Sequence, residues 1–384
     1  MLFFATCPKG LESLLVEELV SLGAYSTKET RAGVSFDMKL DEAYRVCLWS
    51  RLANHIYVPL KTATLTDVEE LYQLAYRFPW DNHMTVDNTF AINADLINAP
   101  INNNQYVIQR FKDGLVDYWR KKSGRRPDVQ TEQPDFRFHI LIKNNEFTLS
   151  LNMSGESLHK RKIRLEGGLA PLKENLAAAL LLRAGWPDIA KAGGSLFDPL
   201  CGSGTFLIEG ALIAADIAPG LLRDYFGFLQ WREFKPAIWK KLLDEANDRR
   251  EAGLKQLPSI TGQDINANVV YLAKENVKRL GLSDYIIIEQ CDLVDTQKLF
   301  VEPGLVITNP PYGVRLGEIE QLKETYRKLG ALFKSHFYGW KCSVFTGNVD
   351  LAKALKLGPE KIYKFFNGAI ACQLLNFLVR PPKD

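Results

Sequence analysis

The first third of the chain mixes short alternating patterns with amphipathic helical patterns. Leucines at positions 11, 14, 15, 19 and 22 recur with the spacing of one helix face, and Gly23 follows as a typical helix end. Two apolar runs on either side of Lys143–Glu146 predict a hairpin. We therefore expect an α+β region. Its expected strands are Phe3–Thr6, Val34–Met38, Phe90–Asp95, Arg137–Ile142 and Phe147–Met153, and its expected helices are Lys9–Leu22, Asp41–Leu52 and Gln105–Lys122.

The rest of the chain has a different rhythm, in which apolar strand-like runs alternate with helical patterns. This alternation predicts a doubly wound α/β sheet with helices on both faces. The last two runs are joined by a short link, which favours a terminal antiparallel hairpin on a mostly parallel, seven-stranded sheet. The expected strands are Ser195–Leu200, Ser259–Asp264, Tyr285–Asp292, Gly304–Thr308, Lys341–Thr346, Lys361–Phe366 and Leu374–Val379, and the expected helices are Leu172–Ala184, Thr205–Ala215, Ala267–Leu280 and Ile319–Phe337.

Composition narrows the class of protein. The 384 residues suffice for two or three domains, and 46% hydrophobic with 24% charged residues is ordinary for a globular protein. No apolar run reaches the ~18 residues of a membrane span, and the first residues do not resemble a signal peptide. Six scattered cysteines without a CxxC pair suggest neither zinc nor disulfides. We therefore expect a cytoplasmic protein without a metal site.

Positive charge is concentrated in one segment. The net charge of the chain is +3, whereas residues 102–165 contain 13 basic and 7 acidic residues, a local excess of +6. Any one such cluster is often only a solvated surface, but two clusters beside an α+β module favour phosphate contacts. The candidate phosphate-binding residues are Arg120, Lys121, Lys122, Arg125 and Arg126 in the first cluster, and Lys160, Arg161, Lys162 and Arg164 in the second.

A glycine-containing turn follows the first strand of the second part. In Asp198–Thr205 (DPLCGSGT), the glycines allow a ligand to approach the backbone, and ligands of open α/β sheets bind at the carboxyl ends of strands. The position suits a nucleotide-like cofactor, although a tight turn without a ligand would have the same pattern. A dinucleotide-binding GxGxxG motif matches less well, because Leu207 stands at the last glycine position.

A second motif, Asn309-Pro310-Pro311-Tyr312, directly follows the fourth strand. The Asn309 amide can accept a hydrogen bond from an amino group, and Pro311 keeps the Pro310 carbonyl out of a helix. Two acceptors can therefore face one planar amino group, while Tyr312 offers a ring for stacking. A plain proline-rich turn is the alternative for this motif taken alone.

The order of the motifs strengthens both interpretations, because the glycine turn and the NPPY motif would face the same edge of the sheet. Two acids stand between them at strand ends: Asp264, where an acid commonly holds ribose hydroxyls, and Asp292, which could accept from an adenine amino group. Either acid could instead cap a helix, and for Asp264 this alternative is strong because Asn266 and Ala267 begin one.

These segments resemble motifs I and IV of class I amino-methyltransferases, and more closely the RlmL-type 23S rRNA guanine-N2 methyltransferases. The closer likeness extends over nearly the whole chain, through segments such as TCPKGLESLLVEEL, PLKENLAAALLLRAGW and NPPYGVRL. It implies an N-terminal ferredoxin-like region at 1–55, completed at about 155–165. An RNA-binding THUMP domain at 56–155 and a methyltransferase domain at 166–384 would follow.

The resemblance also implies S-adenosylmethionine as cofactor, RNA as partner and N2 of a guanine in 23S rRNA as target. Asn309, Pro310 and Tyr312 would hold the target amino group, with no metal involved. The residues implied for the cofactor are Ala170, Leu172, Asn175, Asp198, Pro199, Cys201, Gly202, Gly204, Thr205, Asp264, Ile265, Asp292, Leu293 and Asn309, with Cys291 beside Asp292.

Two departures from the pattern stand out. Asp264 lies 60 positions after Gly204, against about 20 in a minimal dinucleotide unit, so residues 216–257 are expected to be an insertion that covers the target base. Some family members continue into a second methyltransferase unit that makes N7-methylguanine. This chain ends at Asp384, so that activity is not expected.

Three other functions remain open from the residues alone. An N6-adenine methyltransferase acting on DNA or RNA would also use NPPY. A non-catalytic RNA-binding assembly factor would retain the fold, but intact Asp198, Gly202, Gly204, Asn309 and Tyr312 disfavour it. A nicotinamide dehydrogenase is disfavoured by the missing glycine at Leu207.

Overall fold

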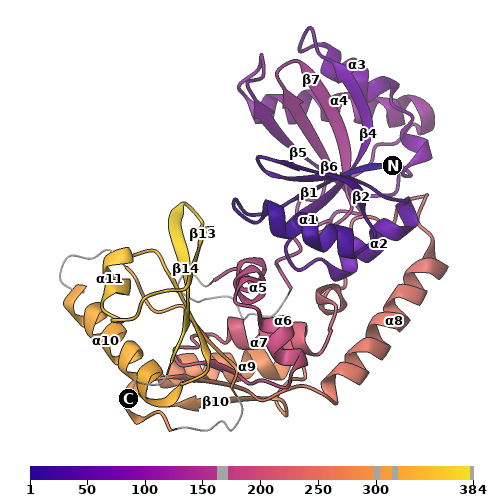
Figure 1. The fold of residues 1–384 in the computed structure, drawn as a ribbon. Coiled ribbons are helices and arrows are strands. Elements are labelled where there is room, and N and C mark those ends of the chain that lie inside the picture. Colours follow the sequence, from indigo (N-terminus) through magenta and orange to yellow (C-terminus); the bar gives the residue numbers. More distant parts are fainter. Residues whose placement is uncertain (162–171, 298–302, 314–318, 381–384) are drawn as a thin grey trace. The chain divides into compact units, whose positions relative to one another are not determined.

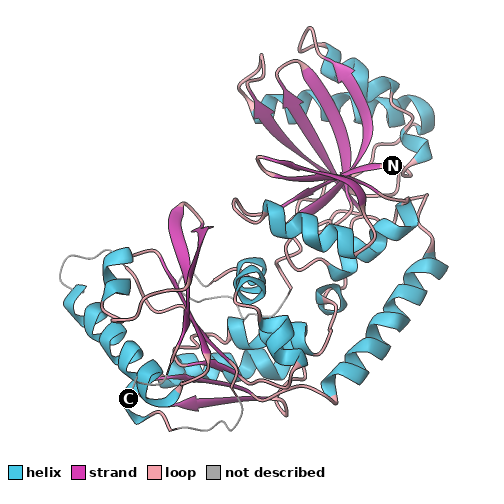
Figure 2. Ribbon diagram, viewed as in Figure 1, coloured by secondary structure: helices cyan, strands magenta, loops and turns pink. Residues whose placement is uncertain are grey.

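The computed structural model describes residues 1–161, 172–297, 303–313 and 319–380. The chain forms two compact units, and it passes between them more than once (Figure 1). The N-terminal unit contains residues 1–7, 15–158 and 223–242, and the C-terminal unit contains residues 8–14, 159–222 and 243–384. Each unit is built on its own β-sheet (Figure 2).

The N-terminal sheet has the strand order β2-β3-β1-β4-β7-β6-β5 in the part of the chain that the structure describes. Only β5 and β6 run parallel, and the other neighbours are antiparallel. The elements are β1 (Leu2–Thr6), α1 (Glu12–Ser21), β2 (Tyr25–Thr30), β3 (Gly33–Asp37), α2 (Leu40–Trp49), β4 (His55–Thr64), α3 (Glu70–Arg77), the 3-10 turn η1 (Trp80–Asn82), β5 (Phe90–Ile97), α4 (Asn104–Ser123), β6 (Phe136–Lys143) and β7 (Glu146–Asn152).

Strand β4 makes this sheet continuous across the predicted boundary at residue 55. Its first residues pair with β1, as in Tyr57 opposite Phe4, and the strand then continues along β7 as far as Thr64. Alternating inward residues of β6, such as Phe138 and Ile140, are fully buried. The division into ferredoxin-like and THUMP domains remains a prediction, because one sheet spans both regions.

The predicted insertion contributes directly to the N-terminal unit. Phe228 stacks on Tyr44 with ring centroids 4.6 Å apart, and the Gly227 N–H donates to the Met153 carbonyl at 2.9 Å. The Arg223 guanidinium donates to backbone carbonyls that include Ser154 at 3.0 Å. These contacts fasten residues 223–242 to the N-terminal unit, while the expected role over a target base remains a prediction.

The C-terminal sheet has the order β10-β9-β8-β11-β12-β14-β13 among the described residues. Strands β10, β9, β8, β11 and β12 are parallel, and β14 is antiparallel to both β12 and β13. This confirms the predicted α/β fold. Its elements are α5 (Glu174–Arg183), α6 (Trp186–Lys191), β8 (Leu196–Asp198), α7 (Thr205–Ala214), η2 (Pro219–Leu222), α8 (Pro236–Leu254), β9 (Ile260–Asp264), α9 (Ala267–Arg279), β10 (Ile286–Gln290), η3 (Leu293–Asp295), β11 (Leu305–Thr308), α10 (Ile319–His336), β12 (Lys341–Thr346), α11 (Val349–Lys353), β13 (Lys361–Asn367) and β14 (Ile370–Leu378).

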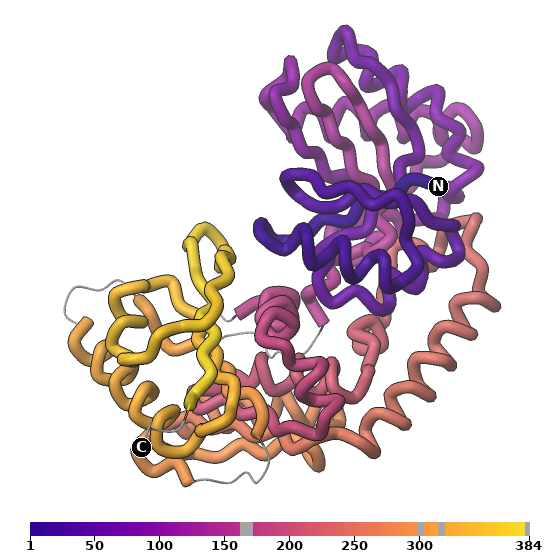
Figure 3. Tube along the Cα trace, viewed as in Figure 1, coloured from indigo at the N-terminus to yellow at the C-terminus, as the bar shows by residue number. Residues whose placement is uncertain are grey.

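Central strands β8 and β11 are buried along their whole length, as expected for a parallel sheet covered on both faces. The hairpin β13–β14, yellow in Figure 3, completes the sheet at the C-terminal end of the chain. None of the helices that the structure describes is long and apolar enough to cross a membrane.

Candidate functional site

The predicted motifs meet at one edge of the C-terminal sheet. Strand β8 lies between β9 and β11, with Phe197 opposite Val306 and Asp198 opposite Gly262. Because these strands are parallel, their carboxyl ends and the loops after them lie together. The loops that contain Asp198, Asp264 and Asn309 are therefore neighbours, although up to 111 positions separate them in the chain.

The glycine loop after β8 is held by hydrogen bonds from the next strand. The Cys201 N–H donates to the Gln263 carbonyl at 2.8 Å, and the Gly202 N–H donates to Asp264 Oδ2 at 3.1 Å. From α9, Asn276 Nδ2 donates to the Ser203 carbonyl at 3.1 Å. Asp264 therefore fixes this loop, and the cap of α9 is Asn266, which accepts from two backbone N–H groups of that helix.

Open space lies over Gly202, in contrast to the tight packing at a nearby glycine. A Cβ added at Gly202 would have no atom within 4 Å, whereas one at Gly262 would lie 2.3 Å from Leu207 Cδ1. Gly202 also has a φ of +54°, a conformation that favours glycine. The loop can therefore receive a ligand directly over its backbone. Within the loop, Pro199 and Cys201 are buried, and Thr205 begins α7.

Asp198 lies at the base of this loop in an apolar environment. Its side chain is almost fully buried, and its Oδ1 accepts from the Leu200 N–H at 3.1 Å. Burial disfavours the carboxylate and raises the pKa of Asp198 to about 7, despite this hydrogen bond. The nearby Asp264 carboxylate acts in the same direction, so Asp198 can gain or lose a proton near neutral pH.

The acid after the third strand is already part of a local turn. Asp292 Oδ1 accepts from the Val294 N–H at 3.2 Å and lies 3.6 Å from Lys328 Nζ. Asp292 therefore caps a 3-10 turn. Its predicted role toward an adenine group, like those of exposed Ile265 and buried Leu293, remains a prediction.

The residues after β11 present two hydrogen-bond acceptors. Asn309 Oδ1 is shielded from solvent and has no hydrogen-bond partner in the described part of the chain. The next residue, Pro310, is buried, and no described residue donates to its carbonyl. A buried acceptor without a donor, such as Asn309 Oδ1, is costly, so this site is suited to a ligand that brings its own N–H groups.

Tyr312 is held in place by the C-terminal hairpin. Asn367 Nδ2 donates to the Tyr312 hydroxyl at 2.8 Å, and Phe345 meets the ring edge-on at 6.5 Å between centroids. A Cβ at Gly347 would lie 2.9 Å from ring atoms of Tyr312, so only glycine leaves room for the ring. Burial raises the pKa of Tyr312 to about 12, and the hydroxyl stays protonated.

The helix predicted to line the cofactor is α5. Leu172 precedes it and is almost fully buried, and Asn175 in its first turn is completely buried. Ala170, Lys162 and Arg164 were also predicted as site residues, but they lie outside the described residues.

The predicted phosphate-binding residues have different environments. The prediction that Arg161 contacts a phosphate is wrong. Its fully buried guanidinium donates to both carboxylate oxygens of Glu209, so it cannot reach an RNA phosphate. Arg120, Lys122 and Arg125 each pair with an aspartate at the surface. Lys121 lies over the Tyr76 ring. Arg126 is exposed, as is Lys160, and their roles toward RNA remain predictions.

Sequence patterns missed three residues that shape the site: Asn276, Gly347 and Asn367. Asn367 precedes Gly368 in a tight turn, which is a recognisable signal for a hairpin. Nothing local, however, connects it with Tyr312, 55 positions earlier. Among the residues described, no group of three or more His, Cys, Asp or Glu side chains could hold a metal ion.

Three family models match consecutive parts of the chain. Residues 2–57 match an RlmL ferredoxin-like domain, residues 66–152 a THUMP domain, and residues 161–376 the RMKL-like methyltransferase domain. Similar curated proteins include the ribosomal RNA large subunit methyltransferases K/L of Syntrophotalea carbinolica (49% identical) and Allochromatium vinosum (47% identical). The alignments cover 98% and 99% of this chain but 53% and 52% of those proteins, so the chain spans about half their length.

Two solved structures are similar over nearly their whole length. The SMU.472 protein, a methyltransferase candidate solved in complex with SAH, has a TM-score of 0.86 at 28% identity, covering 100% of this chain and 99% of its own. A protein of Listeria monocytogenes described as a predicted N6-adenine-specific DNA methylase has a TM-score of 0.85 at 30% identity, covering 98% and 96%.

Proposed function

The chain belongs to the family that shares the RMKL-like methyltransferase domain, and from this premise we propose that it transfers a methyl group from S-adenosylmethionine to an RNA base. The target that we propose is the exocyclic N2 of a guanine in 23S rRNA. The observation that carries the proposal is the shielded Asn309 Oδ1, which lacks a hydrogen-bond donor among the described residues. An exocyclic amino group supplies such a donor.

The residues at the strand ends fit the cofactor. Gly202 leaves room for a ligand over the backbone, Asp264 accepts from the Gly202 N–H, and the Asp198 carboxylate lies at the base of the same loop. We propose that these residues, with Asn175 and Leu172 from the region of α5, hold S-adenosylmethionine. When bound, the cofactor supplies an electrophilic methyl group on a positively charged sulfur.

The protein then acts mainly by orientation. The lone pair of an exocyclic nitrogen is delocalised into the base, which makes it a weak nucleophile. Hydrogen bonds from its two N–H groups to Asn309 Oδ1 and the Pro310 carbonyl favour a more tetrahedral nitrogen. These fixed dipoles stabilise the charge that develops there. The methyl group would take the place of one hydrogen on the nitrogen, and the released proton would pass to solvent.

Tyr312 completes the proposed base site. Its ring is fixed by Asn367 and Gly347, so it offers a rigid face on which the base can stack. A guanine inside a helix would first have to flip out, at a cost of a few kcal/mol.

RNA as the substrate is supported by the THUMP match and by the names of the curated relatives. Because the chain spans about half of those relatives, we propose for it only this methyl transfer and not their full activity. A ribosomal RNA substrate would also make the protein cytoplasmic.

A second candidate is methylation of adenine N6 in DNA or RNA. The name of the Listeria structure favours it, since that protein is described as an adenine-specific DNA methylase. The same pair of acceptors would serve an adenine amino group, so the geometry around Asn309 is compatible with either base.

The test is to incubate the protein with methyl-labelled S-adenosylmethionine and, separately, with protein-free 23S rRNA and with DNA, and then to identify the labelled nucleoside. We expect N2-methylguanosine from the rRNA. An Asn309→Ala variant should lose activity by roughly 10²–10³-fold, as is typical when one stabilising dipole is removed.

The possible outcomes separate the candidates. Label in N6-methyladenine would mean that the target base is adenine and not guanine, and the proposed residues of the site would stay the same. Label that persists in Asn309→Ala would show that this amide does not act on the target nitrogen. Lack of S-adenosylmethionine binding by the wild type would contradict the enzyme proposal altogether.

A further inference from the structure

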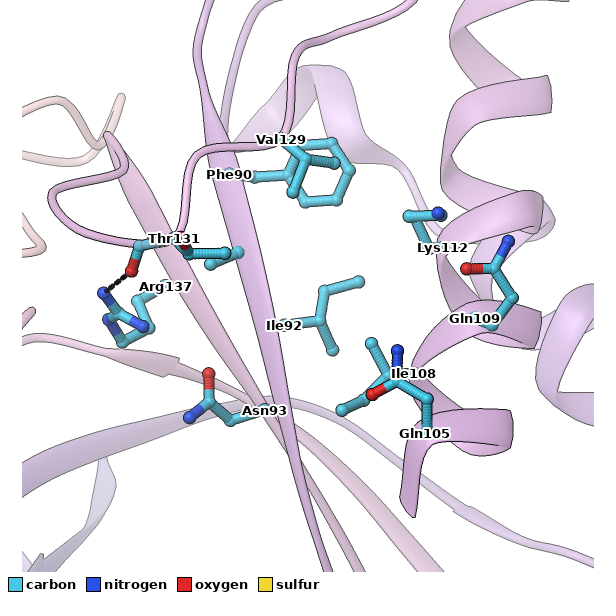
Figure 4. Close-up of a pocket in the computed structure, with 11 residues that line it drawn as sticks. Phe90, Ile92, Asn93, Gln105, Ile108, Gln109, Lys112, Val129, Thr131 and Arg137 are labelled. Carbon is cyan, nitrogen blue, oxygen red and sulfur yellow. Dashed lines mark hydrogen bonds between the residues drawn. The ribbon is translucent and has the colours of Figure 1, made fainter. Parts of the chain in front are cut away.

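A pocket of about 400 Å³ lies in the N-terminal unit, far along the chain from the methyltransferase motifs. It is formed by the edge strand β5, helix α4 and the segment around Val129. Figure 4 shows that the lining residues stand on both sides of β5, with Ile92 on the side of α4 and Asn93 and Arg137 on the other. The pocket therefore straddles the open edge of the sheet.

The edge of β5 is only partly paired. The Phe90 N–H donates to the Asp128 carbonyl, and the Phe90 carbonyl accepts from the Gln130 N–H, both at 3.0 Å. Farther along, the Ala94 carbonyl accepts from Asn104 Nδ2 at 2.8 Å. Peptide groups on a strand alternate in direction, so those of Ile92 point the same way as those of Phe90 and Ala94, away from β6.

Ile92 is the residue between these two anchored positions. No described residue bonds to its backbone N–H or carbonyl on this side, and Ile92 lines the pocket. The pocket thus contains one backbone donor beside one backbone acceptor. A peptide strand would need several successive open residues, but Phe90 and Ala94 are already engaged. One residue with a free N–H and a free carbonyl suits the edge of a single planar ligand group.

The remaining lining suits a nucleotide. Ile92, Ile108 and Val129 supply apolar surface for the faces of a base. Lys112 and Arg137 supply positive charge, and Arg137 is fixed by hydrogen bonds from Nη2 to the carbonyls of Thr131 (2.8 Å) and Glu132 (3.0 Å). Neither side chain forms a salt bridge with a described residue, so each can face a phosphate from its own side of β5.

We propose that this pocket binds one unpaired nucleotide of the RNA substrate, its base edge pairing with the Ile92 peptide groups and its phosphate lying near Lys112, on the same side of β5 as Ile92. Every nucleobase carries a donor next to an acceptor on its Watson–Crick edge, so the pocket recognises single-stranded character and not a particular sequence. The inference rests on the proposed function for its RNA partner, but it concerns substrate binding and not methyl transfer.

The test compares two fluorescein-labelled RNA duplexes that differ only in a short single-stranded extension. Fluorescence anisotropy with the full chain should give roughly tenfold tighter binding of the extended duplex, comparable with one bidentate base contact. Gln109→Trp, which places an indole at the pocket mouth, should abolish this difference. Tyr106→Trp is the matched control, because Tyr106 is an exposed residue of α4 that does not line the pocket.

A second measurement reports on the strand edge directly. Hydrogen exchange of the peptide containing Ile92 should slow when the extended duplex is added, and not with the blunt one. Equal affinity for both duplexes, or a preference that survives Gln109→Trp, would overturn the pocket proposal even if rRNA is methylated. Conversely, a preference that Gln109→Trp abolishes would support the pocket even if no methylated guanosine is found.

Discussion

The two sheets of this protein have the same number of strands in the described residues, but they offer binding groups in different places. The C-terminal sheet is mostly parallel, so the ends of β8, β9 and β11 bring Asp198, Asp264 and Asn309 to one edge. The N-terminal sheet is mostly antiparallel, and its strand ends point in both directions. Its candidate site lies along the side of β5, where peptide groups are open.

This difference determines which sites a sequence reveals. A parallel sheet collects residues that each follow a strand, and short motifs therefore mark them. A site on a strand edge depends on which partner strand is missing and on where a helix lies. No motif in β5 signals its pocket, because backbone groups make the proposed contacts.

The largest expected effect is a loss of stability on changing Arg161. Its basic neighbours in the sequence suggested an RNA contact, whereas the structure buries it in the core. Arg161→Met should destabilise the protein by about 3–5 kcal/mol, because it removes the buried guanidinium that donates to the buried Glu209 carboxylate. Chemical denaturation measures this loss. Changing Glu209→Leu as well should restore much of the stability, because the buried carboxylate is then removed together with the guanidinium.

Arg126→Met is the matched control for Arg161. Arg126 is exposed, so this change should leave stability unaltered. It should lower the slope of log affinity for RNA against log salt concentration by about 1, the value of one phosphate contact. If Arg161→Met proved stable and only weakened RNA binding, the buried ion pair would not be a structural element.

Much of the fold could be predicted because its elements have local patterns. The alternation of strands and helices after residue 172 predicted the C-terminal sheet, and apolar periodicity predicted α1, α4 and the β6–β7 hairpin. Strand β2 was missed because it is polar and exposed nearly throughout. Strand β4 was missed because Pro59 interrupts its pattern, at the point where the structure has an irregular register.

The next effect concerns pH at the strand-end site. Asp198 has a pKa of about 7 because burial disfavours its charge, so it is largely neutral at lower pH. A positively charged cofactor binds the ionised form better. We expect affinity for S-adenosylmethionine to rise up to about tenfold per pH unit as pH increases toward 7, and then to level off. Calorimetric titration between about pH 6 and pH 8 would measure it.

Asp198→Asn provides the control for this profile. The variant cannot ionise, so its affinity should be low and nearly independent of pH. Its folded state should also gain stability relative to the wild type above about pH 7, because the wild type then carries a buried charge. The sign follows from the raised pKa: the native state holds the proton longer than the unfolded chain, so wild-type stability falls as pH rises toward 7. If the affinity of the wild type for S-adenosylmethionine did not change with pH, ionisation of Asp198 would play no part in cofactor binding.

For the site, the residues that follow strands were predictable, whereas those acting from a distance were not. Asp264, Gly202 and Asn309 stand in recognisable motifs. Asn276 and Gly347 act through contacts with Ser203 and Tyr312, which only the folded sheet brings near. Arg161 was misassigned because a basic segment has the same sequence pattern whether its side chains are exposed or buried.

The smallest expected effect is on kcat/KM, and it tests whether the strand-end site is complete without the C-terminal hairpin. Asn367 does not reach the proposed base directly; it is a positioning residue that donates to the Tyr312 hydroxyl from the end of β13. Asn367→Ala should lower kcat/KM for RNA by about threefold to tenfold, the value of one hydrogen bond. Cofactor affinity and thermal stability should be nearly unchanged, because the hairpin ladder remains. Tyr312→Phe should cause a similar loss, and the double variant should lose little more, since both changes remove the same hydrogen bond. Additive losses would mean that Asn367 and Tyr312 act independently, and the parallel sheet edge would then suffice to form the site.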